Sequence, residues 1–340
     1  MEEKNNLIIE VYNVFKDYLD EQNPMTKDDI YRALAERGIG ISDDTLTKCI
    51  KQINNQMDIK INVTKGRYAK YQLVSRLFKY SELKLMIDAI NSSSVIDEKT
   101  TTSIVEKLKK TGSLHEAKEL ERSSTGVNKA KTQNTILLEN VDMIQKAFKE
   151  HCRIEFDYME WTPKKKLKIK KIKSSSGKEF NHSMEPWKLF WADDRYYLFG
   201  YDTYMKEGEQ PKIRNYRVDK MCNIRLLEEE KRQFIDQFSQ FNLDAYVAEH
   251  MGMYGNDVHH FEVEVPEYLI GAFIDQYGTG VHIEETDNEK IYKIHFRSAV
   301  SPIVIGWMIG MREVCVIKPD SARAMMKEVL ENNLKRLKDL

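Results

Sequence analysis

The spacing of hydrophobic residues predicts short helices and a hairpin at the start of the chain. Apolar residues recur with the 3.6-residue period of a helix in three consecutive stretches, residues 7–19, 30–34 and 46–53. Thr26 is a typical helix-capping residue and Gly38 a typical stop, so the second helix lies between them. Two alternating runs, residues 59–63 and 68–74, flank the Gly-containing turn at 64–67. This order predicts a winged helix-turn-helix.

A polar segment separates a second helical region from a region of strands. Helical periodicity continues from residue 77 to about residue 120, which indicates a connector. Residues 121–135 are mostly polar and contain a single Val, so they are predicted to be a linker. After a helix over residues 141–148 the spacing changes to period two. The runs that follow predict the strands of a small barrel, at residues 154–158, 167–172, 187–191, 196–201 and 213–221.

The last third of the chain mixes both patterns. Strands are predicted at residues 260–265, 291–296 and 312–317, and helices near residues 267–277, 304–311 and 321–337. The chain is therefore predicted to be a multidomain α+β protein, which its length also favours. The predicted divisions are a winged helix-turn-helix DNA-binding domain at 1–76, a helical connector and linker at 77–135, a small β-barrel domain at 136–232 and an α+β domain at 233–340.

Composition excludes several classes of protein. Apolar residues make up 41% of the 340 positions and charged residues 31%, a balance that excludes collagen-like, low-complexity and largely disordered chains. The longest apolar stretch, Ala299–Met311, is too short for the ~20 residues of a membrane-spanning helix, and the start of the sequence lacks the pattern of a secretory signal. We therefore expect a cytoplasmic protein with no membrane partner. The cysteines lie far apart, so neither a disulfide framework nor a zinc ribbon is indicated.

Positive charge is concentrated in two runs although the net charge is only −1. Residues 45–76 carry one acid, Asp58, and seven basic residues, which are Lys48, Lys51, Lys60, Lys65, Arg67, Lys70 and Arg76. Residues 164–173 carry seven lysines and no acid. Nucleic-acid phosphates require concentrated charge of this kind, and the first run coincides with the third helix and the hairpin. The second run has an alternative interpretation as an edge strand whose lysines prevent aggregation.

The third predicted helix and the hairpin tip carry the candidate DNA contacts. In a winged helix-turn-helix the third helix enters the major groove, where its outward side chains contact bases and phosphates. The polar residues that the apolar stripe leaves outside are Thr45, Thr47, Lys48, Lys51 and Gln52. The candidate wing contacts are Lys65, Arg67 and Tyr68. Asp43 and Asp44 are expected to cap the helix, whose N-terminal dipole favours negative charge. Alternatively, this domain packs against a protein partner and binds no DNA.

Three motifs in the predicted barrel occur in the order found in a known family. They are Pro186-Trp187-Lys188-Leu189, Arg195-Tyr196-Tyr197-Leu198 and Tyr216-Arg217-Val218-Asp219-Lys220-Met221. This segment resembles the WYL domain of bacterial winged-helix transcriptional regulators, and residues 306–319 are similar to the C-terminal extension of that family, called WCX. The resemblance implies a small Sm-like β-barrel that senses a ligand, and a C-terminal module that serves dimerisation or regulation.

The predicted strand at 213–221 carries the candidate ligand contacts. Alternation along it places Arg214, Tyr216, Val218 and Lys220 on one face, and Asn215, Arg217, Asp219 and Met221 on the other. An inward guanidinium with aromatic rings nearby suits a phosphate or a single-stranded nucleic acid. The candidate ligand-binding residues are Tyr158, Arg195, Tyr197, Arg214, Tyr216, Arg217 and Lys220. Alternatively, Arg217 forms an internal ion pair with Asp219 or Glu155 that only stabilises the barrel.

Two functions from different classes remain at this point. The first is a transcriptional regulator that binds a double-stranded DNA operator with an inverted repeat as a homodimer and responds to a nucleotide, a single-stranded nucleic acid or another phosphate-bearing ligand. The second is a nucleic-acid-binding accessory protein that modulates a defence nuclease or a DNA-repair complex. None of the common nucleotide-binding, metalloprotease or hydrolase motifs is present, so we expect no enzyme and no cofactor. The histidines His259, His260, His282 and His295 could be drawn as a metal site, but we interpret them as ordinary strand and loop histidines, so no metal site is expected.

Overall fold

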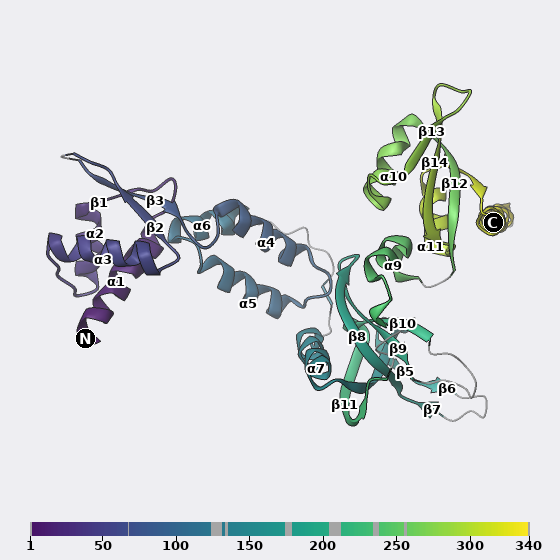
Figure 1. The fold of residues 1–340 in the computed structure, drawn as a ribbon, viewed down its shortest axis with the longest axis horizontal. Helices are drawn as coiled ribbons and strands as arrows, with labels where there is room; N and C mark the ends of the chain where they lie inside the picture. The colour runs from purple at the N-terminus through teal and green to yellow at the C-terminus, as the bar shows by residue number, and fades with distance from the viewer. Residues whose placement is uncertain are drawn as a thin grey trace. The chain divides into compact units, whose positions relative to one another are not determined.

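The computed structural model divides the chain into two compact units, residues 1–137 and 138–340 (Figure 1). It describes residues 2–66, 68–123, 131–132, 135–173, 179–203, 212–233, 238–254 and 257–338. Both units combine helices with antiparallel strands, so the predicted multidomain α+β class is confirmed. Among the described residues, no helix is both long and apolar enough to cross a membrane. The four-part division of the chain stays a prediction.

The first unit begins with helices packed on a small sheet. The helices are α1 (Glu2–Tyr18), α2 (Lys27–Glu36) and α3 (Asp43–Gln56), and the strands are β1 (Met25–Thr26), β2 (Lys60–Val63) and β3 (Lys70–Ser75). The antiparallel sheet has the order β1-β3-β2. Thr26 caps α2 as predicted, because its side chain accepts a hydrogen bond from the backbone of Asp29, which in turn accepts one from Thr26. Gly38 follows α2 with a φ of +74°, a conformation that glycine adopts at low cost.

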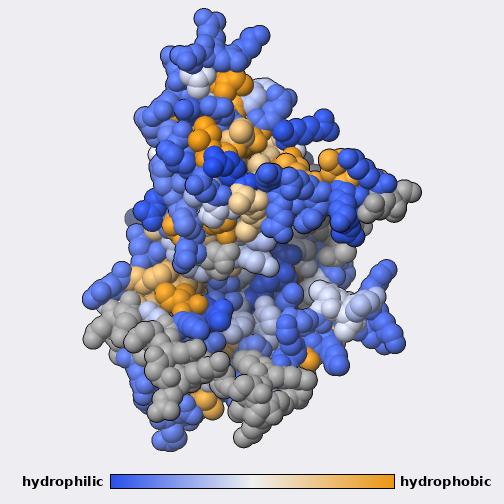
Figure 2. Space-filling model, turned by 90° about the vertical axis from the view of Figure 1, so that its right-hand side faces the viewer, coloured by the Kyte–Doolittle hydropathy of each residue, from blue (hydrophilic) through white to orange (hydrophobic). Residues whose placement is uncertain are grey.

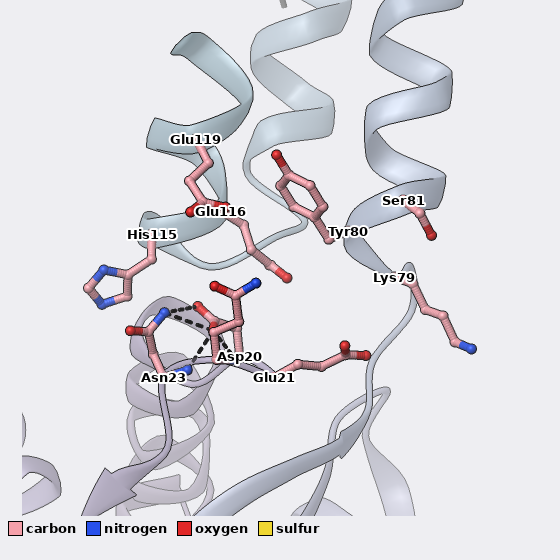
Figure 3. Close-up of a pocket in the computed structure, with 10 residues that line it drawn as sticks. Asp20, Glu21, Asn23, Lys79, Tyr80, Ser81, His115, Glu116 and Glu119 are labelled. Carbon is pink, nitrogen blue, oxygen red and sulfur yellow. Dashed lines mark hydrogen bonds between the residues drawn. The ribbon is translucent and has the colours of Figure 1, made fainter. Parts of the chain in front are cut away.

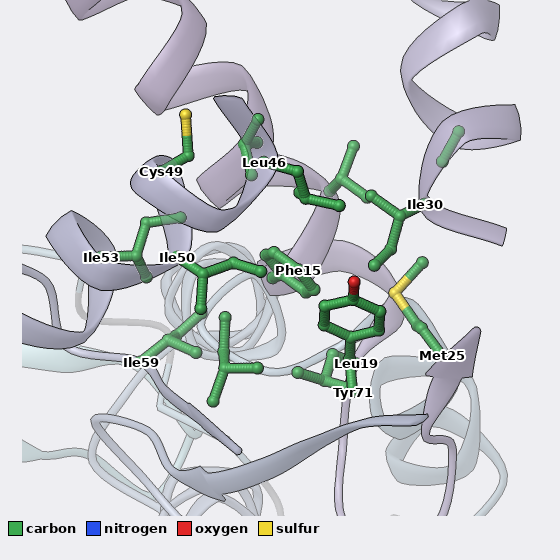
Figure 4. Packing of buried hydrophobic residues seen from close by; sticks show 14 of the residues in the cluster. Phe15, Leu19, Met25, Ile30, Leu46, Cys49, Ile50, Ile53, Ile59 and Tyr71 are labelled. Atoms are coloured by element: carbon green, nitrogen blue, oxygen red, sulfur yellow. The ribbon is translucent and has the colours of Figure 1, made fainter. Parts of the chain in front are cut away.

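The apolar stripes of these helices meet in one core. Phe15 from α1, Leu19 just after that helix, Ile30 from α2 and Ile53 from α3 are completely buried, and Tyr71 of β3 closes the core from the sheet side (Figure 4). The ring centroids of Phe15 and Tyr71 are 5.9 Å apart. The core therefore determines which face of α3 is buried and which face is left outside.

A helical region completes the first unit. It consists of α4 (Tyr80–Ser92), α5 (Glu98–Lys109) and α6 (Leu114–Ser123). A small core of Leu83, Ile87, Val105 and Leu120 holds the helices together. These helices occupy the region from residue 77 to about residue 120 in which the sequence showed helical periodicity. The signal is weakest in α6, whose sequence LHEAKELERS is half charged and presents few apolar positions.

The second unit begins with α7 (Leu137–Glu150) and a curled antiparallel sheet. The strands are β4 (Cys152–Trp161), β5 (Leu167–Lys170), β8 (His182–Ala192), β9 (Arg195–Asp202), β10 (Lys212–Arg217) and β11 (Met221–Lys231). The order is β10-β9-β8-β4-β11, and β5 pairs with β4. A two-stranded ribbon, β6 (Ile172–Lys173) and β7 (Glu179–Phe180), accompanies it. Within the described residues, β10 and β11 end the sheet order and do not pair with each other.

The predicted strand at 213–221 is wrong in its second half. β10 ends at Arg217, and residues Val218–Lys220 form a 3-10 turn, in which the backbone N–H of Met221 bonds to the carbonyl of Val218. Alternation between faces requires extended backbone, so it holds only as far as Arg217. Val218 and Lys220 therefore do not continue the face of Arg214 and Tyr216.

The C-terminal part of the second unit is a sheet covered by helices. The strand order is β13 (His282–Glu285), β14 (Ile291–Ala299), β12 (Val258–Pro266) and β15 (Cys315–Lys318). The helices are α9 (Leu243–Glu249), α10 (Ile270–Tyr277), α11 (Pro302–Gly310) and α12 (Asp320–Lys338), with short 3-10 turns at Met251–Met253 and Glu267–Leu269. Phe261, Phe273, Phe296 and Met308 lie in its core. The sequence located every one of these strands except β13.

Candidate nucleic-acid interface

The face of α3 opposite the core carries the predicted DNA contacts. Leu46, Cys49, Ile50 and Ile53 are buried. The side chains of Thr47, Lys48, Lys51 and Gln52 are exposed, and Thr45 is half-buried. Thr47 donates a 2.9 Å hydrogen bond to the carbonyl of Asp43, which holds its hydroxyl close to the helix. The helix therefore presents two ammonium groups and an amide together on one accessible face.

The start of α3 is capped by Ser42, so the expectation that Asp43 and Asp44 supply the cap is wrong. The Ser42 hydroxyl accepts a hydrogen bond from the backbone N–H of Thr45 at 3.3 Å. Asp43 instead accepts hydrogen bonds from Lys27 at 2.5 Å and from the hydroxyl of Tyr31. These two bonds lower the pKa of Asp43, while burial and the bond to Asp43 raise the pKa of Tyr31 to about 12. The negative charge of Asp43 is thus balanced by α2.

The hairpin tip places two of the three predicted wing residues at the surface. Lys65 is exposed, and Tyr68 is 84% exposed. The loop is closed by Thr64, which accepts a bond from the N–H of Lys70 through its hydroxyl at 2.8 Å and donates its own N–H to the Lys70 carbonyl at 2.9 Å. Arg67 lies outside the described residues.

Two members of the first basic run have structural roles instead. Lys60 donates to the backbone carbonyls of Asn54 and Met57, where α3 ends. The side chain of Arg76 is only 3% exposed and pairs with Glu116. The exposed cations of this run that the structure describes are Lys48, Lys51, Lys65 and Lys70. The exposed positive charge on this surface is therefore smaller than the seven basic residues of the run would suggest.

The second basic run extends from the turn before β5 through β5 and into β6. Lys164, Lys165, Lys166 and Lys168 are exposed, and the ammonium group of Lys170 lies 2.6 Å from the carboxylate of Glu160. Lys171 donates to Asp157 and Asn181. β5 pairs with β4 alone among the described strands, the position expected of an edge strand. The side chain of Lys173 lies outside the described residues.

A pair between Arg217 and Asp219 stands at the centre of the candidate ligand site. Arg217 donates from Nε to Oδ1 of Asp219 at 3.1 Å and from Nη2 to Oδ2 at 2.6 Å. Burial acts to lower the pKa of Arg217, but the hydrogen bonds and the charge of Asp219 outweigh it and raise that pKa. Glu155 accepts a bond from Asn181 at 2.6 Å. Of the two internal partners considered for Arg217, the structure shows Asp219.

Other predicted ligand residues gather around this pair. The hydroxyl of Tyr158 accepts a 3.4 Å hydrogen bond from the backbone N–H of Arg217, and burial raises the pKa of Tyr158 to about 12. Burial, and then the positive charge of Arg217, lower the pKa of Lys220. Arg195 also acts on Lys220 and on Tyr197 by its charge. In the described part of the chain, Nε of Arg195 is buried and has no hydrogen-bond partner. The candidate ligand site therefore contains the cations Arg195, Arg217 and Lys220 and the phenol groups of Tyr158 and Tyr197.

Two of the predicted residues have different surroundings. The side chain of Arg214 is 53% exposed, and its Nε lies 3.7 Å from Oδ2 of Asp202. Tyr216 packs edge-on against Phe156 and Tyr158, with ring centroids 5.0 and 5.3 Å apart, and its hydroxyl lies 3.3 Å from Nδ1 of His182. Sequence reasoning missed Phe156 and His182 as neighbours of this site. The alternation of β4 could have indicated Phe156, whereas no sequence signal pointed to His182.

A cavity of about 220 Å³ in the first unit lies between the end of α1 and the starts of α4 and α6 (Figure 3). Asp20 and Glu116 line it, but their carboxylates already accept hydrogen bonds, Asp20 from Ser113 and Asn23, and Glu116 from Arg76. Among the described residues there is no group of three or more histidines, cysteines or acids that could hold a metal ion.

Comparisons with known proteins identify the domain that carries the candidate ligand site around Arg217. Residues 139–226 match the family model of the WYL domain, which confirms the resemblance inferred from the three motifs. No curated protein matches the sequence.

Similar solved structures include the proteasome accessory factor B/C (PafBC) of Arthrobacter aurescens, which is 13% identical over 95% of this chain and 46% of that one, with a TM-score of 0.29. This chain thus spans about half the length of that protein. A second, described as a CRISPR Cas-related protein, is 9% identical over 99% of this chain and 86% of that one, with a TM-score of 0.37.

Proposed function

We propose that this chain, whose residues 139–226 form a WYL domain, is a sequence-specific DNA-binding transcriptional regulator of the cytoplasm. In this proposal the helices and the sheet of residues 2–75 act as a winged helix-turn-helix. The curled sheet acts as an Sm-like barrel that senses a nucleic acid or another phosphate-bearing ligand. The protein binds an inverted repeat as a homodimer and performs no catalytic step.

The observation that carries the proposal is the exposed polar face of α3. Lys48 and Lys51 can neutralise phosphates, and Gln52 can form paired hydrogen bonds with a base edge in the major groove. These side chains stand opposite the buried stripe, so contact with DNA requires no rearrangement of the core. The bonds from Lys27 and Tyr31 to Asp43 reduce the repulsion between this acid and DNA.

The chemistry of the WYL site supports an anionic ligand. Arg195 and Arg217 both lower the pKa of Lys220 by their positive charge, and two hydrogen bonds to Asp219 orient the guanidinium of Arg217. Burial of several cations is costly unless an anion compensates them. The buried Nε of Arg195 offers a donor to such an anion. Tyr158 and Tyr197 add rings that can contact a base or sugar.

The experiment is a fluorescence-anisotropy titration of the full chain against labelled duplex DNA from upstream of its own gene. It is run at two salt concentrations, with and without short single-stranded oligonucleotides. We expect specific duplex binding that the oligonucleotide alters. Lys48→Ala with Lys51→Ala should weaken duplex binding and lower the slope of log affinity against log salt by about 0.9 for each lost phosphate contact.

A matched control removes two lysines from the same unit without touching α3. Lys107 on α5 and Lys118 on α6 are both exposed, so Lys107→Ala with Lys118→Ala removes the same charge. This variant should retain the affinity and the salt slope of the wild type. If only single strands bind and the α3 variant behaves as the wild type does, the regulator proposal is wrong and an accessory role in a nuclease or repair complex replaces it.

A further inference from the structure

The hairpin of β4 and β5 extends beyond the rest of the WYL sheet. At Tyr158, β4 still pairs with Met221 of β11 on one side. The next three residues of β4 pair only with β5 in the described part of the sheet, and Trp161 lies opposite Leu167. At about 3.3 Å per residue, these pairs form a two-stranded ribbon roughly 10 Å long. Residues 159–169 are called the basic ribbon below.

The turn at the tip of the basic ribbon has a fixed conformation. Thr162 closes it, because its N–H and its hydroxyl each donate to the carbonyl of Lys166 at 2.9 Å. The carbonyl of Thr162 accepts the N–H of Lys165, also at 2.9 Å. Lys165 has a φ of +57°, a left-handed conformation in which glycine or asparagine is more usual. An ordered backbone thus presents the lysines of the turn.

Four lysines of the basic ribbon are exposed and form no ion pair within the described residues. They are Lys164, Lys165, Lys166 and Lys168. The two lysines that follow the ribbon are paired instead, Lys170 with Glu160 and Lys171 with Asp157. Like charges this close in sequence repel one another, so an anion bound beside them would stabilise the arrangement.

Protection of a sheet edge does not explain where these charges lie. A lysine prevents edge-to-edge pairing when it stands on the edge strand itself, as Lys168 does on β5. Lys164, Lys165 and Lys166 precede β5 and lie in the turn, where there is no strand edge to protect. Their concentration at the tip therefore favours a partner with many negative charges, such as a nucleic acid.

We propose that the basic ribbon enters a groove of double-stranded DNA and contacts the phosphates on both sides of it. The major groove is about 12 Å wide and admits a two-stranded β-ribbon. The lysines act as point charges on phosphates, so the contact is independent of base sequence. This inference rests on the proposed function, in which DNA is the partner of the chain. It adds a second DNA contact, outside α3 and outside the pair of Arg217 and Asp219.

The side chains of the basic ribbon favour a duplex over a single strand. Proteins that bind single strands stack successive bases on aromatic side chains. The ribbon contains one aromatic residue, Trp161, which is 54% exposed, and its neighbours on the same face are the aliphatic Leu167 and Ile169. Apolar side chains also lie open among hydrophilic ones on the face of the molecule shown in Figure 2. The exposure of Trp161 alone therefore indicates no stacking site.

The first test measures the affinity of the full chain for a random-sequence duplex by fluorescence anisotropy over a range of salt concentrations. Lys164→Ala with Lys166→Ala and Lys168→Ala should bind about tenfold more weakly at low salt. The slope of log affinity against log salt should fall by about 0.9 for each lost phosphate contact. Arginine at the same three positions keeps the charge and should retain the affinity. An unchanged slope in the alanine variant would overturn the proposal.

A matched control removes three exposed lysines from other parts of the second unit. It replaces Lys149, Lys290 and Lys327 by alanine and should keep the affinity and the salt slope of the wild type. If this control loses as much affinity as the ribbon variant, the effect is one of net charge and the ribbon is not a binding surface.

The second test repeats the titration with a single-stranded oligonucleotide of the same sequence. We expect the ribbon variant to lose more affinity for the duplex than for the single strand. An equal or larger loss on the single strand would overturn the groove contact. The random duplex contains no operator, so a failure of the ribbon is measured apart from a failure of the proposed function. The latter appears as no preference of the wild type for its upstream DNA over the random duplex.

Discussion

Arg76 donates a 3.0 Å hydrogen bond from its guanidinium to the carboxylate of Glu116, and this pair joins the residue after β3 to helix α6. The two side chains are only 3 and 10% exposed. Arg76 also donates to the carbonyl of Leu19 after α1, and Glu116 accepts the backbone N–H of Ser113 at 2.8 Å. The contact thus connects the sheet, α1 and α6 through one buried charge pair.

Removal of one partner from this pair should destabilise the first unit strongly. Arg76→Ala leaves Glu116 as a buried charge without its counterion, which costs about 3–5 kcal/mol. Arg37→Ala is the control, because Arg37 pairs with Asp17 at 2.6 Å but both side chains are more exposed, so about 1 kcal/mol is expected. Urea unfolding measures both. Arg76→Met with Glu116→Leu should recover most of the lost free energy of unfolding. If Arg76→Ala and Arg37→Ala lower the free energy of unfolding equally, burial does not make the pair of Arg76 and Glu116 stronger.

Arg217 should be required for the response to ligand and not for binding to the duplex. Arg217→Ala removes the guanidinium that Asp219 orients, so the oligonucleotide should no longer alter duplex affinity. Arg217→Lys keeps the charge but cannot form the paired hydrogen bonds, and we expect it to lose most of the response as well. Anisotropy in the presence and absence of the oligonucleotide measures this. Equal loss of basal duplex affinity and of the response in both variants would show that the pair only maintains the fold.

Asp20 should make the first unit sensitive to acid. Burial acts to raise the pKa of this carboxyl, but hydrogen bonds from Ser113 and Asn23 outweigh it and lower the pKa below 3.8. A group whose folded-state pKa is lowered stabilises the fold above its unfolded pKa, and this contribution is lost as the pH falls through the folded value. The free energy of unfolding should therefore fall more steeply below about pH 4 in the wild type than in Asp20→Asn. Parallel pH profiles would exclude this role for Asp20.

Periodicity and capping signals were enough to predict the first part of the fold. The stripes at Phe15, Ile30 and Ile53 all face one core, and Thr26 starts α2 as expected. Elements with weak signals were missed, such as β13, whose sequence His-Ile-Glu-Glu has one apolar residue. The strand predicted through Lys220 failed because a 3-10 turn is stabilised by a local hydrogen bond that alternation does not reveal.

The candidate sites depended on tertiary contacts that a sequence does not contain. The outward residues of α3 could be predicted, because a helical period determines the exposed face once the buried face is known. The roles of Lys60 and Arg76 could not, since their partners at Met57 and Glu116 are fixed by how the elements pack. The sequence could name Asp219 and Glu155 as possible partners of Arg217, but only the turn after β10 brings Asp219 within 2.6 Å of it.

Gly200 of β9 lies against the backbone of β8 in the WYL sheet, with no room for a side chain. It pairs with Pro186 on β8 and with Arg214 on β10. A Cβ at this position would lie 2.0 Å from the backbone carbonyl oxygen of Glu185 and 2.7 Å from the terminal methyl of Met184. The methionine can move away, but the carbonyl belongs to the backbone of the sheet. Any side chain at this position therefore forces β8 and β9 apart.

Gly200→Ala should consequently cost more than about 3 kcal/mol of unfolding free energy, in the range of severe packing defects. Gly306 in α11 provides the matched control, since a Cβ there would meet no atom within 4 Å. Gly306→Ala should stabilise the protein by about 0.5–1 kcal/mol, because alanine favours the helix. Thermal and urea unfolding of the two variants measure the difference. A stable Gly200→Ala protein would mean that β8 and β9 are further apart at this point than the sheet register indicates.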